Sequence, residues 1–300
     1  MTVSVIIVSI GSKDYIYSCL DSLLKQSQLP AEIMVMDNSC QPDFAQKINK
    51  LYPSVKIYSS VNNLFYTGAL NKGIQLAQGE FILCLNDDLV LDQNFIQEAR
   101  AGFRVNERIG SVSGKILRGD RKTLDSTGLS LSVWRTAKER GYGQTDLGQF
   151  NQGGFIFGAS GAAAFYRREM LEAVKKQGDY FDADFHMFYE DLDISWRAQK
   201  CGWLAYYVPT ALIYHVRGGS FRPDSGINKP VARKYLSDQL HWDLIKNRYL
   251  TILKNETFFS FLLHLVPVLI YDSCAWAYVI LYRPGVIKLF FRKIRRLRLF

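Results

Sequence analysis

Cysteine is scarce in this chain, and the spacing that would tie cysteines to a metal is missing. Its five cysteines are scattered over 300 residues, and none of them has the spacing of a zinc site. This usage suits a reducing compartment such as the cytosol. No basic stretch precedes the first apolar run, so we expect no signal peptide. Internal repeats and low-complexity linkers are also absent, and a hydrophobic content of 48% excludes a disordered chain.

The length of the chain limits how it can be divided. A chain of 300 residues has room for one domain of roughly 230 residues with a large core, followed by an appendage. We therefore expect one domain over residues 1–230 and a separate C-terminal segment over residues 231–300.

Strand and helix patterns alternate through the first part of the chain. Helical patterns, one with Ile16 and Leu20 and one from about Tyr66 to Ala77, separate apolar runs typical of buried strands. Such alternation predicts an α/β fold with a mostly parallel sheet and flanking helices. The predicted strands are Val3 to Val8, Glu32 to Met36, Val55 to Tyr58 and Glu80 to Leu85.

Polar side chains follow the last of these strands directly, at Asn86, Asp87 and Asp88. The carboxyl ends of parallel strands form the edge where ligands bind in such sheets, and carboxylates there can hold Mg²⁺ or Mn²⁺ against phosphates. The alternative is an ordinary turn, in which Asp and Asn are common. The next helix, from Gln93, has its own predicted N-cap in Asp92, so the two preceding acids are not needed as caps.

A second acidic cluster follows the aromatic segment 185–189. Glu190, Asp191 and Asp193 open a predicted helix, and Asp193 is placed to pair with Arg197 one turn later. The alternative function of these acids is to stabilise the helix dipole. Asp191 directly follows apolar residues, where desolvation would raise the pKa of a carboxyl group toward that of a general base.

A glycine-rich basic loop is predicted at residues 216–230. It carries Arg217, Arg222 and Lys229, which could clamp a phosphate group. The alternatives are an ordinary exposed loop and, for His215 just before it, a purely structural histidine.

The C-terminal segment is apolar and then basic. Residues 258–282 could span a bilayer by length, but His264, Pro267 and Asp272 interrupt them, which favours a helical hairpin or helices lying in the interface. The alternative is packing on the main domain or dimerisation. Interleaved apolar residues favour an anionic membrane over nucleic acid for residues 283–300. That tail has no acid and seven bases: Arg283, Lys288, Arg292, Lys293, Arg295, Arg296 and Arg298.

Seven motifs extend from Val3 to Tyr214 and beyond, and their order carries more weight than any one of them. They are VSVIIVSIGSKDYIYSCLDSLLKQS, IMVMDNSC, NNLFYTGALNKGI, LNDDLV, GASGAAAFYRREML, FYEDLDISWR and YHVRGGSF. In this order they resemble the family 2 glycosyltransferases of the GT-A fold, in particular rhamnosyltransferase-like members. The resemblance reaches about Arg248. It implies a Rossmann-like sheet with a nucleotide-sugar half over about 1–117 and an acceptor half over about 118–230.

The resemblance assigns roles on the donor side. Asp37 would accept a hydrogen bond from a uracil or thymine base, with Ser9 beside it, and Asn71 would lie near the nucleotide-sugar. Asp88 would hold the divalent cation. Asn86 stands where many relatives have an Asp, so the implied metal site has one strong carboxylate ligand and binds weakly. Further implied donor contacts are Asp87, Arg217 and Arg222.

The resemblance also assigns the acceptor side. Asp191, with Glu190 beside it, would take the proton from the acceptor hydroxyl, and His215 would reach the metal or the diphosphate. Close packing of a strand against a helix would explain the small residues at 158–164 equally well. The implied acceptor contacts are Gly158, Ala159, Ser160 and Trp196.

The sequence therefore predicts an inverting, metal-dependent glycosyltransferase. Its donor would be a UDP- or dTDP-sugar, its sugar one such as rhamnose, and its acceptor a lipid-linked saccharide at the cytoplasmic face of a bacterial membrane. One alternative is a nucleotidyltransferase, but its basic phosphate loop is missing, since only Gly11 and Lys13 follow the first strand. The other is a noncatalytic scaffold, against which the intact acids argue. No oligomeric state is predicted.

Overall fold

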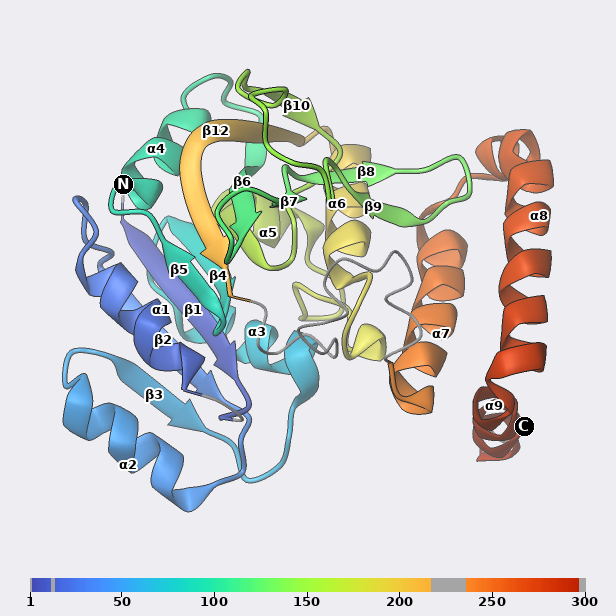
Figure 1. Cartoon of the computed structure of the whole chain (residues 1–300), viewed down its shortest axis with the longest axis horizontal. Helices are drawn as coiled ribbons and strands as arrows, with labels where there is room; N and C mark the ends of the chain where they lie inside the picture. Colours follow the sequence, from blue (N-terminus) through green and yellow to red (C-terminus); the bar gives the residue numbers. More distant parts are fainter. Residues whose placement is uncertain (1, 12–13, 217–235, 297–300) are drawn as a thin grey trace. The chain divides into compact units, whose positions relative to one another are not determined.

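The structure is a computed structural model that describes residues 2–11, 14–216 and 236–296 (Figure 1). These residues divide into two compact units. The first contains residues 2–130 and 138–216, and the second contains residues 131–137 and 236–296. The domain boundary expected at residue 230 lies outside the described residues.

The first half of the larger unit is a parallel β/α arrangement, as predicted. Strands β1 (Val3–Ser9), β2 (Glu32–Asp37), β3 (Lys56–Ser59) and β4 (Phe81–Asn86) lie in the order β4-β1-β2-β3, and all three pairings are parallel. Helices α1 (Tyr15–Leu24), α2 (Pro42–Leu51) and α3 (Phe65–Leu76) connect them. The predicted strands are correct to within one residue at every end. The sequence reading did not assign α2.

The second half extends the same sheet with strands of mixed direction. The order continues from β4 through β11 (Ala163–Arg167), β6 (Ile109–Arg118) and β12 (Leu204–His215) to β10 (Gly154–Ile156). Strand β11 is antiparallel to both of its neighbours, whereas β12 is parallel to β6. Two short strands, β5 (Leu89–Leu91) and β7 (Leu124–Ser126), pair with β12 and β6.

Helices cover both faces of the sheet, because successive strand residues point to opposite sides. On β1, Val5 and Ile7 pack in one apolar layer with α1, α2 and α4 (Phe95–Gly102). Ile6 and Val8 pack in the opposite layer with α3, α5 (Arg168–Val174) and α6 (Glu190–Lys200). The central strands are therefore buried on both faces, which explains their continuous apolar runs.

One predicted helix boundary is wrong. Helix α4 begins at Phe95 with Asn94 as its N-cap residue, not at Gln93 after Asp92. Asp92 instead forms a turn, in which its Oδ1 accepts from the backbone N–H of Asn94 at 3.1 Å. A short Asp side chain satisfies such a turn as readily as a helix cap, so the sequence pattern alone does not distinguish the two.

The smaller unit consists of three helices and a β-turn segment. Helix α7 (Asp238–Asn255) is followed by α8 (Phe258–Tyr282) and α9 (Pro284–Arg296). Helix α8 continues through Pro267, so the predicted alternative of a helical hairpin within residues 258–282 is wrong. Of the described helices, α8 is long and apolar enough to cross a membrane by length and composition.

The two ends of the β8 and β9 hairpin belong to different units. Strands β8 (Leu129–Leu131) and β9 (Ala137–Glu139) form their own two-stranded sheet. Residues 131–137 at the turn group with the helices of the smaller unit. Glu139, at the end of β9, belongs to the larger unit and enters the candidate active site described next.

Candidate active site

Strand register brings the polar residues of the first half to one edge of the sheet. Ser9 lies opposite Asp37, and Val8 lies opposite Asn86. Ser9 Oγ donates a hydrogen bond to Asp87 Oδ2 at 2.6 Å, which ties the end of β1 to the turn after β4. These side chains therefore share the edge formed by the carboxyl ends of the parallel strands, where ligands bind in such sheets.

The buried side chain of Asp37 is held by hydrogen bonds from neighbouring residues. The backbone N–H of Ser39 donates to Oδ1 at 2.8 Å, and Ser59 Oγ donates to Oδ2 at 2.7 Å. These two bonds fix the orientation of the side chain, and each carboxylate oxygen can accept a further hydrogen bond. That is what recognition of a base N–H requires.

Asn71 links α3 to a distant segment through hydrogen bonds. Its Oδ1 accepts from the backbone N–H groups of Tyr180 (3.1 Å) and Phe181 (2.8 Å), and its Nδ2 donates to the Phe181 carbonyl oxygen at 2.7 Å. The side chain is buried. It therefore positions the segment that leads toward α6, and its predicted contact with the donor stays a prediction.

We expect Asn71→Ala to destabilise the protein by roughly 3 kcal/mol, because unpaired buried backbone groups cost about 1 to 3 kcal/mol each. Asn62→Ala is the matched control, since Asn62 is exposed and such surface changes stay within about 0.5 kcal/mol. Urea unfolding of both variants measures the difference. Equal unfolding midpoints for the two variants would show that the hydrogen bonds of Asn71 do not stabilise the protein.

A buried chain of charged side chains lies behind the same edge. His215 Nδ1 is 2.7 Å from Asp125 Oδ2, and His215 Nε2 is 3.1 Å from Asp88 Oδ1. Burial opposes the charged form, but hydrogen bonds to both carboxylates outweigh it and raise the pKa of His215 to about 9. The two carboxylates therefore favour the protonated imidazole, and Arg118 adds a positive charge 3.6 Å from Asp125.

The donor set here fits a weakly held divalent cation. Asp88 offers a hard carboxylate, and Asp125 behind His215 gives the carboxylate–histidine arrangement found behind bound metals. His215 would have to release its Nε2 proton to a metal, so its role as a ligand stays a prediction. Within residues 2–11, 14–216 and 236–296, no three Asp, Glu, His or Cys side chains form a metal-binding group. A diphosphate would have to complete the coordination shell.

Asp87 titrates at higher pH than an ordinary aspartate. Burial raises its pKa to about 6; the hydrogen bond from Ser9 opposes this shift, and the charge of Asp88 adds to it. Two adjacent carboxylates at the end of one strand repel each other, and a bound cation would relieve that repulsion. This repulsion is a further reason to expect a bound cation at this edge.

The second acidic cluster lies at the N-terminus of α6, as predicted. Asp191 Oδ2 accepts from the backbone N–H of Gly161 at 3.0 Å, and Oδ1 accepts from the N–H of Leu192 at 2.8 Å. Burial raises the pKa of Asp191 despite these bonds. Glu190 beside it is buried and also has a raised pKa, first because of burial and then because of the Asp191 charge. Carboxyl groups with raised pKa values suit acid–base chemistry.

The backbone that enters α6 is strained. His186, Phe188 and Tyr189 have φ angles of 56°, 70° and 69°, in the left-handed region that side chains rarely adopt. The carbonyl oxygen of His186 accepts from the N–H of Tyr66 at the start of α3. Strain of this kind is typical of functional sites. The predicted pair of Asp193 with Arg197 is confirmed at 2.8 Å, so Asp193 has a structural role.

The small residues before β11 pack tightly against α6. A Cβ atom on Gly158 would lie 2.0 Å from Ser195 Oγ, and one on Gly161 would lie 2.9 Å from Asp191 Oδ2. The packing interpretation of this segment is thus confirmed. Its predicted contact with the acceptor is compatible with that packing and stays a prediction, together with those of Ala159 and Trp196. Trp196 packs edge-on against Phe157.

Glu139 joins this cluster without any signal in the sequence. Ser126 Oγ and Ser160 Oγ donate to its two carboxylate oxygens, the latter at 2.9 Å. Burial and then the charge of Asp191 raise the pKa of Glu139 to about 8. Asp125 was missed in the same way. Both lie in short strands whose placement depends on distant pairings, and no local motif marks them. Arg217 and Arg222, by contrast, lie outside the described residues.

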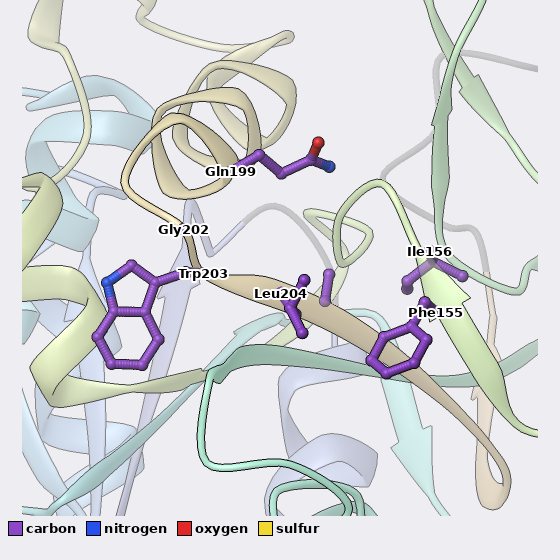
Figure 2. A pocket seen from close by; sticks show the side chains of 7 residues that line it. Phe155, Ile156, Gln199, Gly202, Trp203 and Leu204 are labelled. Carbon is purple, nitrogen blue, oxygen red and sulfur yellow. The ribbon is translucent and has the colours of Figure 1, made fainter.

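A separate hollow lies between β10, the end of α6 and the start of β12 (Figure 2). It contains no ionisable or nucleophilic side chain and therefore does not carry the chemistry. Its lining residues are Phe155, Ile156, Gln199, Gly202, Trp203, Leu204 and Ala205.

Comparisons with known proteins match most of this chain. The profile of glycosyl transferase family 2 matches residues 4–175. An N-acetylglucosaminyl-diphospho-decaprenol L-rhamnosyltransferase of Mycobacterium tuberculosis is 24% identical over 244 residues, covering 72% of this chain and 76% of that protein. A poly-beta-1,6-N-acetyl-D-glucosamine synthase of Staphylococcus epidermidis is 23% identical over 221 residues, covering 71% of this chain. The chain spans about half of that synthase, 49%.

Solved structures share the fold at low sequence identity. A mannosyltransferase of Pyrobaculum calidifontis, in complex with GDP-Man and Mn²⁺, has a TM-score of 0.56 and 15% identity, covering 95% of this chain and 72% of that one. GalNAc-T7 with UDP, GalNAc and Mn²⁺ has a TM-score of 0.58 and 16% identity, covering 72% of this chain and 44% of that one. These likenesses concern the fold alone.

Proposed function

The chain belongs to glycosyl transferase family 2, and from this premise we propose that it is an inverting, metal-dependent enzyme acting on a lipid-linked saccharide. The family and the GT-A fold predicted from the sequence are confirmed. The protein is a glycosyltransferase that takes its sugar from a nucleotide-sugar donor. The sugar, the acceptor and the roles of single residues are proposals.

One observation supports the proposal most: Asp37 and Asp88 lie at the carboxyl edge of the sheet, and a second carboxyl pair, buried Glu190 and half-buried Asp191, lies at the start of α6. The first group would orient the donor's base and diphosphate. Asp191 would accept the proton of the acceptor hydroxyl as that oxygen attacks the anomeric carbon and the bond to the diphosphate breaks. Attack from the face opposite the leaving group inverts the configuration.

The charge of the departing diphosphate needs compensation at the sheet edge. A divalent cation, when bound, would supply it by Lewis acidity. Asp88 and His215 are the residues that would hold it, with Asp125 orienting the imidazole. Asp37 keeps its own hydrogen bonds and would orient the base in either case.

The membrane and the acceptor enter the proposal together. The mycobacterial relative is named for a diphospho-decaprenol substrate, and here an apolar helix of 25 residues precedes a basic tail. We therefore propose attachment to the cytoplasmic face of a bacterial membrane and a role in surface polysaccharide synthesis, with rhamnose as a candidate sugar. Nucleic acid is not a proposed partner.

The donor is identified by thermal stabilisation. Screening UDP-, dTDP- and GDP-sugars with and without Mg²⁺ or Mn²⁺ should reveal one nucleotide class that raises the melting temperature only with metal, since ligand at a hundred times its Kd stabilises by about 2.7 kcal/mol. The variant Asp37→Asn should abolish selectivity for the base. Stabilisation by no nucleotide-sugar under any metal condition would contradict the proposed donor site.

A further inference from the structure

Helix α8 has two faces of different character along its whole length. One face is an exposed apolar stripe, in which Phe259, Ile270 and Leu281 recur every eleven residues and are 83%, 52% and 71% exposed. An eleven-residue repeat keeps side chains in line along an α-helix, which turns by 3.6 residues. The stripe also includes Phe258, Leu262, Leu263, Val266, Leu269 and Ile280. Helix α8 therefore exposes to solvent a row of apolar residues of the kind that helices of soluble proteins bury.

The opposite side of α8 packs on the smaller unit through apolar residues such as Val279, and its polar side chains are bound by two buried arginines of the same unit. Arg135 Nη2 donates to Ser260 Oγ at 2.6 Å and lies 3.0 Å from His264 Nδ1. Arg248 Nη1 lies 2.5 Å from Asp272 Oδ1. His264 and Asp272, which interrupt the apolar segment, thus bind side chains of the same unit.

Those contacts decide how α8 could meet a membrane. A helix that crossed the bilayer would carry Asp272, near its middle, into the hydrocarbon together with the guanidinium of Arg248. Burying charged groups there is costly. Helix α7, which supplies Arg248, also carries Asp243 and Lys246. A helix lying in the interface keeps these groups on the aqueous side and immerses only the stripe.

We infer that α8 lies along the surface of an anionic membrane, with its apolar stripe in the boundary between head groups and acyl chains and α9 as its basic flank. This inference rests on the proposed membrane attachment. In α9, Val286 packs with Trp242 and Val279, whereas Lys288 and Arg292 are exposed. Each exposed cation near an anionic surface adds attraction.

Charge favours a membrane over a second copy of the chain. Two copies paired in parallel through α8 would bring together two tails that each carry seven bases and no acid between residues 283 and 300. Like charges brought together in this way repel each other. An anionic lipid surface satisfies both the stripe and the bases.

Depth measurements test the inference. Single cysteines at Phe259, Ile270 and Leu281 would be labelled with a fluorophore in the full chain, after Cys40, Cys201 and Cys274 are replaced by Ser. Quenching by lipids spin-labelled at different depths, in vesicles with and without phosphatidylglycerol, reports the position of each label. We expect all three labels to lie equally shallow, and tighter binding to the anionic vesicles.

A charge in the stripe is the complementary test. Ile270→Asp should weaken vesicle partitioning by about tenfold or more, the equivalent of one buried aliphatic side chain. Leu147→Asp adds the same charge at another exposed apolar position and should leave partitioning unchanged.

Three results would overturn the inference. A deep label at position 270 between shallow labels at 259 and 281 would mean that α8 spans the bilayer. A dimer seen by light scattering without lipid, whose labels stay unquenched after vesicles are added, would mean that the stripe binds a second copy. An absence of binding to either vesicle type would remove the proposed membrane attachment as well, while donor binding, measured separately by thermal stabilisation, would stand.

Discussion

Asp191→Asn is expected to lower turnover by about 10² to 10⁴, the usual contribution of a general base, and to leave donor affinity almost unchanged. The amide keeps the size of the side chain and can still accept from the N–H of Gly161 or Leu192, but it cannot take the acceptor's proton. Single-turnover kinetics give the rate of the chemical step, and thermal stabilisation by the donor gives its binding. The pH profile adds a second readout. Because burial raises the pKa of Asp191, wild-type activity should fall as the pH drops through that raised value.

Glu190→Gln is the matched control, because it changes the neighbouring carboxyl group without removing the proposed base. Burial and the charge of Asp191 raise the pKa of Glu190 and so favour its neutral form; the neutral amide resembles that form, and turnover should change little. A larger loss in Glu190→Gln than in Asp191→Asn would reverse the two roles. If neither variant loses turnover, both acids serve only the helix terminus, and the base lies elsewhere, with Glu139 the next residue to test.

We expect Asp88→Asn to abolish activity and the dependence of donor binding on Mg²⁺ or Mn²⁺, with the fold intact. The amide still offers an oxygen to His215, so the buried chain that ends at Asp125 keeps its hydrogen bonds. It loses the negative charge that a hard cation requires. Donor titrations with and without metal, together with the melting temperature, separate the two effects.

Asp92→Asn is the control for this change, because Asp92 forms a turn in which Asn serves equally well. It should retain both activity and metal dependence. Unchanged metal dependence in Asp88→Asn would exclude Asp88 from the site. Lost metal dependence in the Asp92 variant would mean that the assay reports the local fold and not a ligand.

Local patterns were enough to predict the parallel half of the sheet. Strands such as β1 are buried on both faces and read as continuous apolar runs, and the crossover helices between them allow essentially one handedness. The edge that carries Asp37 and Asp88 follows from that topology. The acids at the start of α6 were also visible, because they directly follow an aromatic segment.

Non-local pairing explains what the sequence did not reveal. Asp125 and Glu139 lie in short strands, and their partners His215 and Ser160 are 90 and 21 residues away. No periodicity encodes such contacts. Asn71 matched a family motif as a donor contact, yet its amide is bound to the backbone of residues 180 and 181. A short polar side chain suits both uses, and only the fold shows which groups it meets.

Release of nucleoside diphosphate from a nucleotide-sugar tests the central claim most directly. Wild-type protein in anionic vesicles, with Mg²⁺ and a panel of lipid-linked saccharides, should consume one class of nucleotide-sugar and release one nucleoside diphosphate for each sugar transferred. Asp191→Asn should bind the same donor and release diphosphate about 10² times more slowly or worse. Consumption of a nucleoside triphosphate and a sugar phosphate, with release of pyrophosphate and no transfer to any acceptor, would contradict the account and indicate a nucleotidyltransferase.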